Sequence, residues 1–242
     1  MEISVWHVIV SCNLVGVYMS DFNGTFVKCF FLIKGLAQIV NKGTSSASSD
    51  VNTRQEQANG GKRTPALEAK VKKYMQEQYN KLAGKEEFAK LRSSTSFIAT
   101  WDDHDFGKDD IGKTFPFKDI SKDLFLDFWK EPKKSPRRSQ EDGIYTSYYY
   151  GDKGKRVQVI MLDSRYMRDS QYKVNAEDQK LRDKSNTGPY LADASLNTRI
   201  LGDAQWKWLE AELEKPADLR ILSCSIQFLP DFTGWESWSN FQ

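Results

Sequence analysis

Three short apolar runs, each followed by polar or charged residues, constrain the fold of this 242-residue chain most strongly. They are residues 96–101 (SFIATW), 156–162 (RVQVIML) and 220–229 (RILSCSIQFL). Their β-branched and aromatic content and their short length predict buried strands. In the second run both alternating sets of side chains are largely apolar, which is typical of a central strand.

Helical patterns lie between these runs. Thr64 and Pro65 provide an N-cap and a first-turn proline, and apolar residues then recur at helical spacing until Gly84. Apolar periodicity predicts further helices over residues 86–92 and 121–130. The sequence therefore mixes both kinds of element along the chain.

The C-terminal half adds a hairpin and one more helix. Residues 144–162 contain two strand patterns around a glycine-rich turn, and residues 203–215 predict a helix with Trp206, Leu209 and Leu213 on one face. Strands that alternate with helices in this order indicate an α/β sandwich.

The N-terminal segment follows no such pattern. Residues 3–20 carry no charged side chain, which fits a targeting or anchoring segment, a core strand or helix, or a segment foreign to the domain. Residues 41–63 have the polar composition of a linker or exposed loop. We therefore expect an unassigned segment over residues 1–60 and a domain over residues 61–242. The uncharged segment is compatible with a secreted or endomembrane protein but does not determine the compartment.

Composition excludes several classes of function. The chain has 35 basic and 33 acidic residues, a net charge of +2, so no basic excess points to a nucleic-acid partner. It has two histidines and three cysteines without a CxxC pair. A structural zinc site and a site built from three imidazoles are therefore excluded within this chain.

The densest chemical pattern is the acidic loop, which we define as residues 102–110 and which directly follows the first apolar run. It holds one imidazole, His104, and five carboxylates: Asp102, Asp103, Asp105, Asp109 and Asp110. Clustered oxygen ligands with one imidazole suit calcium, magnesium, manganese or ferric iron. The alternative is a solvated loop in which His104 is only a cap or a pairing partner.

A second polar loop, residues 163–169, follows the second apolar run. Arg165 could clamp an anionic oxygen pair, or it could form a structural ion pair with Asp163. Ser164 lacks the GxSxG context of a hydrolase nucleophile. The basic residues 135–138 could contact a phosphate or belong to a solvated loop.

Six blocks, in order, resemble the PhoD-like metallophosphatases, the alkaline phosphatase D family. They are FIATWDDHDFG (97–107), SPRR (135–138), GIY (143–145), VIMLDSRY (159–166), LGDAQW (201–206) with Leu209, and WESW (235–238). The resemblance implies a four-layer α/β/β/α sandwich. It also implies metal-dependent hydrolysis of phosphate mono- and diesters by a metal-activated water, with iron and calcium used by some members.

The resemblance implies metal ligation by Asp103 and Asp109, with Asp102 as a second candidate. Without metal, the charges of Asp103 and Asp109 are expected to repel each other and to resist ionisation. The wider metallophosphatase fold places an Asn-His pair where this chain has Asp103 and His104. By that analogy, His104 lies beside the scissile phosphate as proton donor or charge stabiliser.

The same resemblance gives the second loop a part in substrate binding: Arg165 would hold a non-bridging phosphate oxygen, and Asp163 would orient Arg165. We expect both polar loops to emerge at one edge of the sheet, because each follows a buried run.

The chain departs from the family pattern at three points. No Gly-Asp pair precedes Val17-Tyr18, Asp109 stands where the family has an asparagine, and a later metal-binding His and Asp motif is expected beyond Gln242. These departures predict a partial domain that by itself hydrolyses phosphate esters weakly or not at all. Two alternatives are a truncated or degenerate non-catalytic relative and an unrelated calcium-binding protein.

Overall fold

The computed structural model describes the backbone of three N-terminal strands and residues 63–193, 197–229 and 234–241. The strands are β1 (Val8–Ser11), β2 (Leu14–Ser20) and β3 (Phe26–Phe31), which form an antiparallel sheet in the order β1-β2-β3. Part of the uncharged segment is therefore strand. Because residues 1–60 do not fit the pattern of the domain, the sequence also predicts that they pack loosely; their side-chain packing lies outside the described residues.

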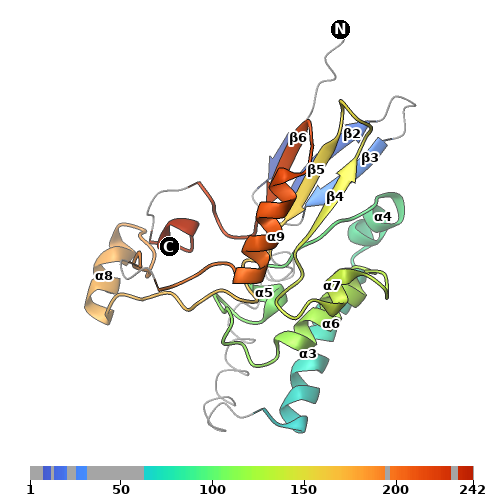
Figure 1. The fold of residues 1–242 in the computed structure, drawn as a ribbon. Coiled ribbons are helices and arrows are strands. Elements are labelled where there is room, and N and C mark those ends of the chain that lie inside the picture. Colours follow the sequence, from blue (N-terminus) through green and yellow to red (C-terminus); the bar gives the residue numbers. More distant parts are fainter. Residues whose placement is uncertain are drawn as a thin grey trace.

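A second three-stranded sheet lies in the C-terminal half (Figure 1). It consists of β4 (Thr146–Tyr150), β5 (Val157–Met161) and β6 (Leu219–Ser223), in that order. β4 and β5 are antiparallel and form the predicted hairpin, whereas β5 and β6 are parallel. The chain is thus mixed α/β, as predicted.

The central strand β5 is buried on both faces, which confirms the prediction from its apolar pattern. Val157, Val159 and Met161 pack with Ile98 on one side. On the other side, a separate cluster contains Ile160, Leu162, Ile200, Leu201, Leu209, Ile226 and Phe241. The strand therefore joins two layers of core.

The prediction of a buried strand over residues 220–229 is wrong in length and in burial. β6 ends at Ser223, and Leu219 and Leu222 are 43% and 44% exposed. β6 pairs with β5 alone among the described strands, so it is an edge strand there. Apolar composition indicated a strand but could not distinguish an edge from the centre.

Residues 96–101 form no strand, contrary to prediction, apart from an isolated bridge at Phe97. The run is nevertheless buried at Ala99, Thr100 and Trp101. The Thr100 hydroxyl donates to the carbonyl of Leu162 at 3.0 Å. Side-chain hydrogen bonds therefore hold the run beside the end of β5 without a backbone ladder.

The predicted helices are present. They are α3 (Pro65–Ala83), α4 (Glu86–Ser94) and α6 (Lys118–Phe128). Their apolar residues form one cluster with the residues around Trp101. Within the described ranges no helix is both long enough and apolar enough to cross a membrane.

Thr64 caps α3, and its removal should measurably weaken the fold. Its hydroxyl oxygen accepts from the backbone N–H of Leu67 at 3.2 Å. We expect Thr64→Ala to lower the free energy of unfolding by about 1 kcal/mol. Urea denaturation measures this loss. Ser93→Ala, an exposed change within α4, is the control and should stay within about 0.5 kcal/mol of wild type; equal effects would contradict a capping role.

Helix α9 (Asp203–Glu214) lies over one face of the β4-β5-β6 sheet (Figure 1). It buries Gln205, Leu209 and Glu212. The predicted inward face is therefore wrong for Trp206 and Leu213, which are 39% and 47% exposed. The cause is hydrogen bonding by Glu212 to side chains of β4 and β5.

Buried Glu212 satisfies several polar groups of the sheet. Its carboxylate accepts from the hydroxyls of Ser147 at 2.9 Å and Tyr149 at 2.7 Å. It also accepts from the side-chain amide of Gln158 at 3.0 Å. A paired polar side chain can be buried at little cost, so apolar periodicity alone misplaced the helix face.

Three short helices were not predicted: α5 (Asp103–Phe106), α7 (Pro136–Ser139) and α8 (Ala176–Lys184). In α7, Arg137 is only 2% exposed, so it belongs neither to a solvated loop nor to an accessible phosphate contact. Its guanidinium donates to the carbonyls of Ala99 at 2.7 Å and Ile144 at 2.8 Å. Arg137 therefore joins the run that precedes the acidic loop to the segment that leads into β4.

Candidate functional site

The two polar loops meet at the same end of β5, as predicted. The indole N–H of Trp101 donates to Asp163 Oδ1 at 2.9 Å, and Arg165 Nε donates to Asp102 Oδ1 at 3.0 Å. The acidic loop begins with helix α5, and residues 163–169 directly follow β5 and Leu162. Two segments separated by about sixty residues thus form one polar cluster.

Asp163 organises this junction through its backbone partners. It is fully buried, and its Oδ1 also accepts from the N–H groups of Arg165 and Tyr166, each at 2.9 Å. Its Oδ2 accepts from the N–H of Ile144 at 2.9 Å. Burial raises the pKa of Asp163, and these hydrogen bonds oppose the rise. Asp163 thus holds the turn that presents Arg165 but does not contact its guanidinium.

Gly143 allows this arrangement. Its φ is +145°, and a Cβ at this position would lie 2.6 Å from Asp163 Oδ2. Any other residue would collide with the carboxylate and would strain the backbone. The glycine is therefore required by the close approach of Asp163.

Arg165 lies between two carboxylates and is 1% exposed. Besides Asp102, it binds Glu236 through a fork, with Nη1–Oε1 at 3.0 Å and Nη2–Oε2 at 2.7 Å. Burial alone would lower the pKa of Arg165, but Asp102 and Glu236 raise it. The ion-pair alternative therefore fits the geometry better than a free clamp, with Asp102 and Glu236 in place of Asp163.

Glu236 and Arg168 were not among the predicted site residues. Arg168 Nη2 lies 3.1 Å from Glu236 Oε1, and Arg168 is 1% exposed. Burial raises the pKa of Glu236 to about 7, although Arg165 and Arg168 oppose the rise. Two sequence signals could have indicated this pair: the carboxylate of the WESW block, and the second arginine of LDSRYMRD.

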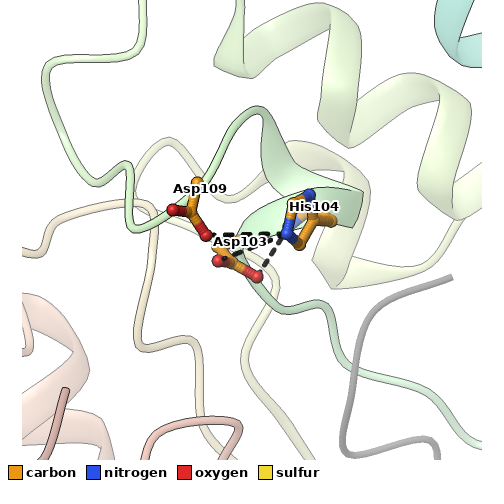
Figure 2. Close-up of side chains that lie close together, drawn as sticks. All are labelled: Asp103, His104 and Asp109. Carbon is orange, nitrogen blue, oxygen red and sulfur yellow. Dashed lines mark hydrogen bonds and ion pairs between the residues drawn. The ribbon is translucent and has the colours of Figure 1, made fainter. Parts of the chain in front are cut away.

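Asp103, His104 and Asp109 form a cluster on the acidic loop (Figure 2). His104 Nε2 lies 3.9 Å from Asp103 Oδ2 and 3.7 Å from Asp109 Oδ1. These separations exceed a hydrogen bond, so the three groups converge without bonding to one another through these atoms. All three ligand atoms lie within 4.8 Å of one another, close enough to share a cation.

Asp103 is prepared for its charged form, and the expectation that it resists ionisation is wrong. Burial would raise its pKa, but Arg165, His104 and two backbone N–H groups lower it overall. Those N–H groups belong to His104 and Asp110, at 2.8 and 3.0 Å from the carboxylate. Asp109 is different, because 75% of its side chain is exposed.

A second possible cation group combines Asp103, Asp110 and Glu236. Its oxygens already have partners: Asp110 Oδ2 accepts from the Tyr190 hydroxyl, and both oxygens of Glu236 accept from Arg165. Asp102 belongs to neither group and pairs with Arg165. The exposed group of Asp103, His104 and Asp109 is therefore the more available one.

The donor set of the exposed group fits a metal ion of the predicted kind. Two carboxylates and one imidazole suit a hard or borderline cation, and a thiolate-seeking metal would find no sulfur ligand there. Burial of Asp102 raises its pKa, with a further increase from Asp103. Arg165 opposes that increase, and so stabilises the negative charge beside the cluster.

Comparison with known proteins decides the family. The family model of the PhoD-like phosphatases matches residues 44–228, which is more than half of the chain. The chain belongs to the PhoD-like phosphatase family. This membership confirms the family suggested by the sequence blocks and supports a phosphatase-type hydrolase. No curated protein and no solved structure matches the chain.

Proposed function

We propose that this PhoD-like chain is a metal-dependent phosphoric ester hydrolase that acts on phosphate mono- and diesters. The observation that carries the proposal is the convergence of Asp103, His104 and Asp109 on one accessible loop. The family match supports a phosphatase-type reaction. The proposal includes the four-layer α/β/β/α sandwich, of which the β4-β5-β6 sheet and α9 would form two layers.

Asp103 and Asp109 would hold the cation, whether calcium, iron, manganese or magnesium. When bound, such an ion polarises a phosphoryl oxygen and lowers the pKa of water. The backbone N–H groups that fix both oxygens of Asp103 would hold its carboxylate in place. Asp102 would serve indirectly, because its contact with Arg165 fixes one side of the guanidinium.

His104 would exchange a proton with a bound ester. A third of its side chain is exposed, and its Nε2 faces the two candidate ligands. An imidazole in such a place can donate a proton to a leaving oxygen or stabilise charge on the phosphate. The test is turnover of an aryl phosphate monoester and an aryl phosphate diester, with and without a chelator. Chelator-insensitive turnover would contradict the metal-dependent proposal.

Metal should stabilise the fold even without substrate. An ion that binds only the folded chain adds about 2.7 kcal/mol at a concentration one hundred times its Kd. We therefore expect calcium, manganese or iron to raise the thermal midpoint, measured separately for each ion. Asp103→Asn should reduce the shift because it removes a charged ligand.

Asp127→Asn is the matched control for the metal melts, since Asp127 is an exposed carboxylate outside the acidic loop that pairs with Lys133 and Arg138. Its variant should keep the full shift. If millimolar metal moves no midpoint, the acidic loop is only a solvated loop.

A further inference from the structure

The carboxylate of Glu236 is bound in the manner of an anionic ligand. Arg165 holds both of its oxygens, Arg168 Nη2 lies 3.1 Å from Oε1, and Gln171 Nε2 donates to Oε1 at 3.0 Å. All three donors follow β5 in the chain, whereas Glu236 belongs to the distant C-terminal segment. Two guanidinium groups and an amide thus enclose one carboxylate.

Arg168 has more donors than the described residues satisfy. Its Nε and Nη1 are buried and have no hydrogen-bond partner there. Its Nη2 reaches Glu236 and the carbonyl of Asp110. A buried guanidinium with unmade hydrogen bonds is costly, so these nitrogens favour an additional oxygen ligand.

A phosphate group meets this requirement better than a carboxylate does. Arginine forks bind carboxylate and phosphate with the same geometry, but a phosphate offers more acceptor oxygens and more charge. Arg165 also donates to Asp102 through Nε, whereas Glu236 accepts from Nη1 and Nη2. Arg165 would therefore stay in place if Glu236 moved away.

We propose that Arg165, Arg168 and Gln171 form a phosphate-binding site that Glu236 occupies as an internal competitor. The inference rests on the proposed function, because that function supplies the phosphate of substrate or product. It adds that Arg168 and Gln171 take part in binding and that Glu236 must yield the site. Glu236 thereby opposes phosphate binding in the state described.

The test is binding of inorganic phosphate by titration calorimetry, with chelator present so that metal makes no contribution. Glu236→Gln removes the competing charge and should tighten phosphate binding by about tenfold or more. Adding Arg168→Met to that variant should abolish the gain. Glu236→Asp keeps the charge on a shorter side chain that spans the two arginines poorly, so an intermediate gain is expected.

Glu131→Gln is the matched control, because Glu131 pairs with another buried arginine, Arg137, at 2.9 Å. The other donors of Arg137 reach carbonyl groups, so this variant should gain no phosphate affinity. Thermal melts identify any variant that fails to fold, and Glu236→Asp then carries the test.

Equal affinity in wild type and in both folded Glu236 variants would overturn the inference, as would a gain that survives Arg168→Met. Because no turnover is measured, the outcome is separate from that of the proposed function. A gain without any ester hydrolysis would leave the binding site standing and contradict only the proposed activity.

Discussion

Arg165→Met is expected to destabilise the fold by about 3–5 kcal/mol, because buried Asp102 loses its described guanidinium partner and buried Glu236 keeps only one guanidinium, that of Arg168. The side chains of Asp102 and Glu236 are only 11% and 13% exposed, and both bind the Arg165 guanidinium. Urea denaturation at neutral pH measures the loss. Methionine is of similar length and flexible, so the loss reports on the charge more than on volume.

Arg199→Met is the matched control for this prediction. Arg199 pairs with Asp203 on the surface, where the two side chains are 57% and 74% exposed. An exposed pair contributes about 0–1 kcal/mol, so this variant should remain close to wild type. Similar losses for the two variants would contradict the importance of the buried cluster.

The deficit of Arg165→Met should shrink as pH falls. Burial already raises the pKa of Glu236 from 4.5 to about 7, and Arg165 is the largest influence that opposes the rise. Removing Arg165 therefore raises this pKa further. When the pKa of a carboxyl group is higher in the folded than in the unfolded state, the free energy of unfolding falls as pH increases through the folded-state pKa. Asp102 loses the same partner, and the ordinary pKa of an aspartate is 3.8, so variant and wild type should converge only below that pH.

The sequence correctly predicted elements whose structure is determined by residues close together in the chain. The Thr64-Pro65 start of α3 and the hairpin of β4 and β5 are present as predicted. The meeting of the two polar loops could also be predicted. Each loop follows an apolar run, and the two runs are buried next to each other. These features depend on short-range capping, turn geometry and apolar burial.

Long-range polar contacts explain two of the predictions that were wrong. The orientation of α9 depends on Gln158 of β5 and Glu212 of α9, which lie far apart in sequence and hydrogen-bond between the sheet and the helix. Arg137 was expected at the surface, yet three acceptors from separate segments allow its burial. A charged or amide side chain looks solvent-exposed in sequence until its partners are known.

The same reasoning applies within the candidate site. The sequence indicated Asp103, His104 and Asp109 because they lie together on one loop, and the structure brings them together. It did not reveal Glu236, which comes from 71 positions beyond Arg165. Only the fold shows that Glu236 and Arg165 form a buried ion pair.

His104→Ala should separate function from stability. The imidazole is partly exposed, and its Nε2 lies 3.7 Å from an Asp109 carboxylate oxygen and 3.9 Å from one of Asp103, beyond hydrogen-bond distance. We therefore expect a change in unfolding free energy within about 0.5 kcal/mol. If His104 stabilises the reacting phosphate, its loss should reduce turnover by about 10²–10³-fold.

The assay is chelator-sensitive turnover of an aryl phosphate monoester and diester. It is run on this chain and on a version that carries the family's upstream and downstream metal motifs. Asp109→Asn is the matched control. It retains an oxygen ligand and restores the amide that the family pattern has there, so it should reduce turnover less than His104→Ala does.

Each outcome bears on a different part of the proposal. Full chelator-sensitive turnover by the 242 residues would contradict the expectation of a partial domain. Unchanged turnover of the extended chain after His104→Ala would contradict the role of His104, because an active variant is both folded and loaded with metal. Silence of the extended chain under every metal would favour the non-catalytic alternative, in which the buried Arg165 cluster serves the fold alone.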